Sequence, residues 1–70
     1  MSSDHSELRN HLKEYRKKLG LTQEALAIKV QVSRKSINAV ENGVYIPSTV
    51  LSLRMAEVLE CSVHDLFELV

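Results

Sequence analysis

The sequence has one cysteine, one proline, two glycines and no tryptophan among its 70 residues. A single cysteine excludes an internal disulfide, and this suits a reducing compartment. No apolar run approaches the length of about 18 residues that a membrane span requires. The first ten residues also lack the basic and apolar segments of a secretory signal. We therefore expect a cytoplasmic protein with no membrane partner.

The rest of the composition is that of one small globular domain. Hydrophobic residues make up 44% of the chain and charged residues 26%, whereas disordered chains are poorer in apolar residues. Ordering a chain costs about 1.5 kcal/mol per residue, so a core of this size favours a compact fold with local, helical connections. We expect a disordered tail over residues 1–6 and one folded domain over residues 7–70.

Charge is distributed unevenly along the chain. Nine basic and nine acidic residues cancel overall. Residues 1–35 nevertheless hold eight Lys or Arg against four acids, and residues 36–70 hold one Arg against five acids, which gives +4 and −4 for the two halves. The basic half can face the phosphates of a nucleic acid. The alternative is an ordinary solvated surface.

Capping residues and apolar spacing predict five helices. Over residues 8–19, apolar side chains recur at spacings of four, three and four, as on one face of a helix. Hydroxyl side chains are natural N-caps for the next four helices, and the last of them forms a capping box with Asp65. These caps are Thr22, Ser33, Ser48 and Ser62. Gly20 and Gly43 are expected to end the first and third helices.

One segment is expected to be extended, and no segment shows a strand pattern. Pro47 disfavours helical geometry at Ile46, so residues 44–47 form a connection.

The fifth helix is expected to run on through Phe67 to Val70. The core-facing side chains of the second to fourth helices are predicted to be Leu26, Ala27, Val30, Ile37, Val40, Leu51, Met55, Val58 and Leu59. The expected fold is all-α, a compact domain of five helices.

The third helix carries the residues that point to a function. At about 100° per residue, Arg34, Lys35, Asn38, Ala39 and Asn42 fall within one arc of roughly 140°, outside the apolar face. Arg and Lys can bind the guanine edge in the major groove, Asn can bind the adenine edge, and small side chains can approach the thymine methyl group. The alternative is a polar, solvated helix face.

The order of the parts resembles a known family. Two short helices joined by a tight turn, the second with an exposed basic start, are typical of a helix-turn-helix. The chain from Arg16 to Phe67 is similar to the phage repressor and Cro-type domain, which is also called lambda-repressor-like. The matching motifs are L-G-L-T-Q (19–23), E-x-L-A (24–27), V-S-R-x-x-I-N (32–38), E-N-G (41–43), P-S (47–48) and L-x6-L-F (59–67).

The resemblance implies a DNA-binding transcriptional regulator, expected to be a repressor, that binds an inverted-repeat operator as a homodimer. The implied base contacts come from Ser33, Arg34, Lys35 and Asn38. The implied phosphate contacts come from Thr22, Gln23, Asn42 and Tyr45, although Tyr45 can equally cover the edge of the core. Arg16 and Glu41 match a partly buried salt bridge between the first and third helices. Exposed apolar residues left for a dimer interface are Leu53, Leu69 and Val70.

Two positions depart from the family pattern. Relatives commonly have glycine where this chain has Gln31, between the second and third helices, and Glu60, after the fourth helix. If these backbones keep a positive φ, each residue is strained by about 1 kcal/mol or more.

Other functions fit the sequence less well. Ser62, His64 and Asp65 contain the groups of a nucleophilic triad but are almost adjacent, so no enzyme is expected. His5, His11, His64 and Cys61 lack the spacing of zinc ligands, so no metal or other cofactor is expected. No small-molecule ligand is evident. The stronger alternative is a protein-interaction module of the same fold, such as an antitoxin or an adaptor.

Overall fold

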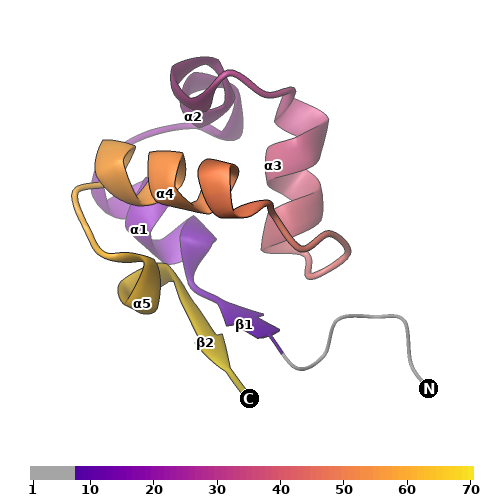
Figure 1. Cartoon of the computed structure of the whole chain (residues 1–70). Coiled ribbons are helices and arrows are strands. Elements are labelled where there is room, and N and C mark those ends of the chain that lie inside the picture. The colour runs from indigo at the N-terminus through magenta and orange to yellow at the C-terminus, as the bar shows by residue number, and fades with distance from the viewer. Residues whose placement is uncertain (1–7) are drawn as a thin grey trace.

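A computed structural model describes residues 8–70, so the tail expected over residues 1–6 lies outside the described part. The elements are the strand β1 (Leu8–Asn10), the helices α1 (Leu12–Lys18), α2 (Gln23–Val30), α3 (Arg34–Glu41), α4 (Thr49–Val58) and α5 (Val63–Leu66), and the strand β2 (Phe67–Leu69). The five expected helices are confirmed. In Figure 1, α4 crosses the middle of the molecule, with α2 above it, α3 beside it and the two strands below.

The N-terminal ends of four helices follow the expected capping pattern. The hydroxyl groups of Thr22, Ser33, Ser48 and Ser62 each accept a hydrogen bond from the backbone N–H three residues later. Ser62 N–H also donates to Asp65 Oδ2 at 3.0 Å, which completes the capping box. Each cap pairs an N–H group in the first turn, where the N–H groups lack the usual helical partner four residues earlier.

Four helices end in the same left-handed turn. The residues after α1, α2, α3 and α4 are Gly20, Gln31, Gly43 and Glu60, with φ values of 71°, 64°, 73° and 59°. In each turn the next N–H group reaches back to a carbonyl five residues earlier, as from Leu21 to Arg16. Gln31 and Glu60 therefore do have the positive φ that the sequence analysis considered, and this conformation strains their backbone.

A two-stranded sheet is the feature that the sequence analysis missed. β1 and β2 pair antiparallel, with Leu8 opposite Leu69 and Asn10 opposite Phe67. The helix expected over residues 8–19 therefore begins only at Leu12, and the fifth helix ends at Leu66. The expectation of no strand was wrong, because the pairing joins segments about sixty residues apart and leaves no local pattern.

The core lies between the helices and extends to the sheet. Its buried side chains are Leu12, Leu26, Ala27, Val30, Ile37, Val40, Leu51, Met55, Ala56, Leu59, Leu66 and Phe67. This agrees with the faces predicted for α2, α3 and α4, except that Val58 is only partly buried and that Ala56, which was not predicted, is buried. Leu19 was placed on the apolar face of the first helix, but it is 43% exposed. Val70 was expected to be exposed and to belong to the fifth helix; it is 71% exposed, but it follows β2 instead. Both follow the end of the regular element before them, so the helical spacing no longer applies. Within residues 8–70 no helix is long and apolar enough to cross a membrane.

Candidate nucleic-acid interface

The helices α2 and α3 pack against each other at one side of the molecule (Figure 1). Ile37 and Val40 turn inward and are buried. The predicted base-contacting residues lie on the opposite side of α3 or at its N-cap, and all four are exposed: Ser33, Arg34, Lys35 and Asn38. The packing of two apolar side chains therefore determines which side of α3 faces solvent.

The side chain of Gln23 links α2 to this face. Its Nε2 donates to Asn38 Oδ1 at 3.2 Å and to Glu41 Oε1 at 3.0 Å, and its Oε1 accepts from Arg34 Nη1 at 3.2 Å. Gln23, a predicted phosphate contact, thus forms hydrogen bonds with two of the predicted base-contacting residues, Arg34 and Asn38. The amide holds their side chains together in the free protein.

A buried ion pair fixes α3 against α1. Arg16 Nε donates to Glu41 Oε2 at 2.6 Å and Arg16 Nη2 donates to Glu41 Oε1 at 3.2 Å, with the two side chains 8% and 4% exposed. Arg16 Nη1 donates to the carbonyl of Leu21 at 2.8 Å. Burial raises the pKa of Glu41, but hydrogen bonds from Arg16 and Gln23 outweigh burial, so the pKa lies below its ordinary value.

The predicted phosphate-contacting residues are spread around this face. Thr22 is the N-cap of α2, where its hydroxyl accepts from Ala25 N–H at 3.0 Å. Asn42 is the exposed C-cap of α3. Tyr45 follows in the loop and is 45% exposed. Asn42 and Tyr45 thus lie at and just beyond the C-terminal end of α3, whereas Thr22 lies at the start of α2.

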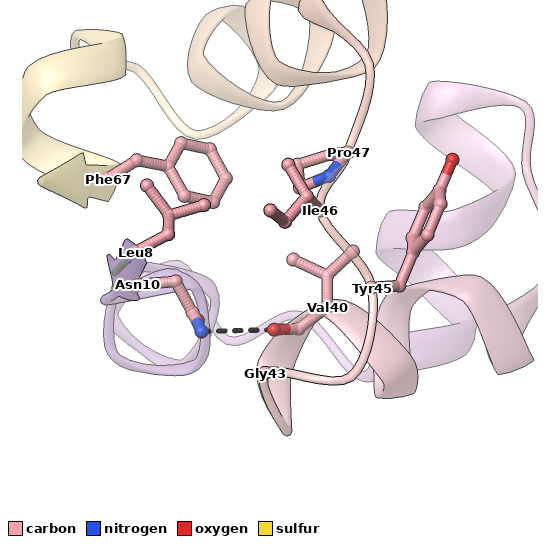
Figure 2. A pocket seen from close by; sticks show the side chains of 8 residues that line it. All are labelled: Leu8, Asn10, Val40, Gly43, Tyr45, Ile46, Pro47 and Phe67. Carbon is pink, nitrogen blue, oxygen red and sulfur yellow. Dashed lines mark hydrogen bonds between the residues drawn. The ribbon is translucent and has the colours of Figure 1, made fainter. Parts of the chain in front are cut away.

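A small cavity lies behind the C-terminal end of α3 (Figure 2). Its volume is about 10 Å³, close to the minimum that one water molecule needs. Its walls come from the sheet, from α3 and from the following loop: Leu8, Asn10, Val40, Gly43, Tyr45, Ile46, Pro47 and Phe67. The space is too small for a metabolite, so these residues form a packing contact between the sheet and α3.

Sequence analysis missed two residues at the start of the domain. Asn10 Nδ2 donates to the carbonyl of Val40 at 3.0 Å, a bond drawn in Figure 2. His11 lies between two carboxylates, with Nδ1 2.9 Å from Glu14 Oε1 and Nε2 2.8 Å from Glu68 Oε2. The hydrogen bond with Glu68, followed by that with Glu14, raises the pKa of His11. The bonds of Asn10 to Val40 and of His11 to Glu68 join segments that are distant in the sequence, which no spacing in the sequence indicates.

Metal ligands are not grouped in the described part of the chain. Over residues 8–70, no three His, Cys, Asp or Glu side chains lie in an arrangement that could hold a metal ion. Cys61 packs partly buried against the core, and burial raises the pKa of its thiol.

Comparison with known families decides how this arrangement is classified. A family model described as helix-turn-helix matches residues 12–66, which run from the start of α1 to the end of α5. The chain belongs to the helix-turn-helix family. This confirms the resemblance found in the sequence motifs.

Relatives of this helix-turn-helix protein occur among archaeal regulators. It is 43% identical over 60 residues to an uncharacterized HTH-type transcriptional regulator of Archaeoglobus fulgidus, a match covering 86% of each chain. It is 50% identical over 52 residues to an uncharacterized HTH-type transcriptional regulator of Methanothermobacter thermautotrophicus, and this match covers 74% of this chain and 75% of the relative. These relatives are named as regulators rather than as enzymes.

A solved structure has the same fold. The restriction-modification controller protein C.AhdI from Aeromonas hydrophila superimposes with a TM-score of 0.73 at 33% sequence identity. The match covers 77% of this chain and 82% of that protein. The arrangement of helices around α2 and α3 is therefore one that a controller protein also uses.

Proposed function

We propose that this helix-turn-helix regulator reads an inverted-repeat DNA operator through the major groove as a homodimer, and that it acts as a repressor. The observation that carries the proposal is the exposed polar face of α3, which the buried Arg16–Glu41 pair orients. An α-helix fits the major groove, where each base pair presents a distinct pattern of donors and acceptors.

The side chains divide by the contacts that we assign to them. Arg34, Lys35 and Asn38 contact base edges, with Ser33 beside them at the start of α3. Thr22, Gln23, Asn42 and Tyr45 contact phosphates on either side of the groove. Phosphate contacts position a protein without reading sequence, whereas base contacts discriminate between sequences. Substitutions in the base-contacting group should therefore change which sequence is preferred, whereas substitutions in the phosphate-contacting group should weaken binding to all sequences.

The selected DNA site tests the base-reading assignment. We expect selection from a random pool to yield an inverted repeat. Arg34→Ala and Lys35→Ala should each weaken binding to that site by about 1–3 kcal/mol and relax one base position. Lys29→Ala is the matched control, because Lys29 is an exposed lysine in the last turn of α2, at the end opposite Gln23. Equal losses on selected and random DNA would show that Arg34 and Lys35 contact only phosphate.

The opposite pattern is expected for the phosphate group. Gln23→Ala and Asn42→Ala should weaken binding to all sequences alike. A changed consensus would contradict the phosphate role. Failure of the parent protein to select any site, or to bind heparin at low salt, would favour the alternative role as a protein-interaction module.

Exposed apolar residues support the dimer. Leu53 on α4 is 56% exposed, and Val50, one turn earlier on the same helix, is 59% exposed. Leu69 and Val70 are exposed near the end of β2, away from α4 (Figure 1). Two-fold pairing through these side chains would remove apolar surface from water and present two α3 helices about 34 Å apart, one turn of DNA.

A single substitution tests this interface. Leu53→Glu should convert the dimer into a folded monomer and weaken operator binding, as measured by sedimentation at micromolar concentration and by titration with DNA. Ile28→Glu is the matched control, because Ile28 is 67% exposed on α2 and lies outside the proposed interface. A parent protein that sediments as a monomer, or a selected site without two-fold symmetry, would contradict the stable dimer.

A further inference from the structure

The side chain of Asn10 joins three elements that are distant in the sequence. Asn10 is the last residue of β1 and lies opposite Phe67 of β2. Its Oδ1 accepts from Leu12 N–H at the start of α1 at 3.2 Å. Its Nδ2 donates to the carbonyl of Val40 in the last turn of α3 at 3.0 Å (Figure 2). One amide thus connects the sheet and α1 to the helix that carries the proposed base contacts.

The acceptor of this bond is otherwise only partly satisfied. The last four carbonyls of a helix have no partner within the helix, and that of Val40 is one of them. It accepts from Gly43 N–H at 3.1 Å and, from the other side, from Asn10. The next residue, Glu41, is held by Arg16. Two consecutive residues of α3 are therefore anchored to residues 10–16, one through its backbone and one through its side chain.

We propose that Asn10 is a positioning residue for DNA reading, which sets the tilt of α3 and so contributes to sequence specificity. The proposal rests on the proposed function of α3. In that arrangement Asn10 contacts no DNA. It acts on the base contacts of α3 through its hydrogen bond to the carbonyl of Val40.

The geometry of α3 makes this control effective. The helix has eight residues and is about 12 Å long at 1.5 Å per residue. A tilt of about 5° about its C-terminal end would displace the N-terminal end by about 1 Å. Functional groups generally need placement within about 0.5 Å of the productive geometry. A tilt of this size on loss of the anchor at Val40 would disturb the contacts of Arg34 and Lys35.

The variant Asn10→Asp separates the two roles of this side chain. A carboxylate still accepts from Leu12 N–H, and its negative charge suits the N-terminus of α1. It cannot donate to the carbonyl of Val40 unless it is protonated. We expect Asn10→Asp to lose about five- to tenfold in affinity for the DNA site that the parent selects, with less than about twofold loss on random DNA. Thermal melting establishes that the variant is folded at the assay temperature.

A control variant removes a cap without touching α3. Ser62→Ala loses the N-cap of α5, and Asn10→Ala loses both bonds of Asn10. If Asn10→Asp does not fold, the comparison of these two variants decides. Asn10→Ala should lower the ratio of selected-site to random-DNA affinity about fivefold or more, whereas Ser62→Ala should leave the ratio unchanged despite its lower melting temperature.

Three outcomes are distinguishable. A lowered ratio for the Asn10 variants alone supports the positioning role. A parent-like ratio for Asn10→Asp, or for Asn10→Ala where Asn10→Asp does not fold, would mean that Asn10 only caps α1, and the inference would be overturned while the proposed function stood. If the parent itself selects no site, the proposed function fails first, and the inference fails with it.

Discussion

Replacing Glu60 by glycine should stabilise the domain. Glu60 has a φ of 59° after α4, a conformation that costs an L-residue about 1–2 kcal/mol because its Cβ approaches the backbone. Glycine has no such cost. It does lose more conformational entropy on folding, by about 0.4–1 kcal/mol. The net expectation is a gain of about 0.5–1 kcal/mol in the free energy of unfolding, or about 2–8 °C in melting temperature for a domain of this size.

Two controls separate backbone strain from the effect of the carboxylate. Glu60→Ala removes the charge but keeps the Cβ atom, so it should melt within about 0.5 kcal/mol of the parent. Gly20→Ala is the reverse experiment after α1. Gly20 has a φ of 71°, and a Cβ atom placed there would meet no atom within 4 Å. This substitution should therefore destabilise by about the amount that Glu60→Gly gains, through backbone strain alone.

The assay is thermal and urea unfolding of the three variants and the parent. Glu60→Gly melting at or below the parent temperature would refute the claim that the turn after α4 stores strain. A gain matched by Glu60→Ala would assign the effect to the charge.

Three other predictions follow from the ion pairs and the charge distribution. Arg16→Ala or Glu41→Ala should each cost about 3–5 kcal/mol in the free energy of unfolding, because each leaves a buried charge without its partner. Joint replacement of both residues by apolar residues should cost much less. A single variant that melts like the parent would contradict this prediction. The pKa of His11 is raised above its ordinary value of 6.5 by Glu68 and Glu14, so the contribution of His11 to stability is complete below that value and is lost as the pH rises through its higher folded-state pKa. Urea unfolding between about pH 6 and pH 9 should show this loss, and His11→Gln should abolish it; an unchanged pH dependence in the variant would remove His11 from the explanation. Binding to DNA should weaken at least about tenfold between roughly 50 and 200 mM salt despite zero net charge, because only the basic surface meets phosphate; salt-independent binding would refute the electrostatic part of the proposal.

The sequence predicted the features of the fold that depend on near neighbours. Each N-cap forms its bond three residues along the chain, and Ile37 and Val40 lie on one helix face by spacing alone. The sheet could not be predicted in this way. Leu8 fits the spacing of a helix with Leu12, and only the partner strand about sixty residues later determines that the segment is extended.

The candidate site divides in the same way. The exposed arc of α3 follows from helical spacing. The bonds of Gln23 to α3, and that of Asn10 to Val40, depend on how elements pack, and an amide side chain gives no sign in the sequence of which distant group it will bind. The strain at Gln31 and Glu60 was recognisable only against a family pattern that places glycine there.

The pairing of β1 with β2 also determines how the domain can be linked to other proteins. Leu8 and Leu69 lie opposite each other, at the end of the molecule farthest from α2 (Figure 1). Chain that continues before Leu8 or after Leu69 therefore leaves the domain at one corner, remote from the start of α3. A short linker from Val70 to Leu8, in place of residues 1–7, would close the described domain into a ring, and new termini could then be opened in the loop at residues 44–46 without cutting a helix.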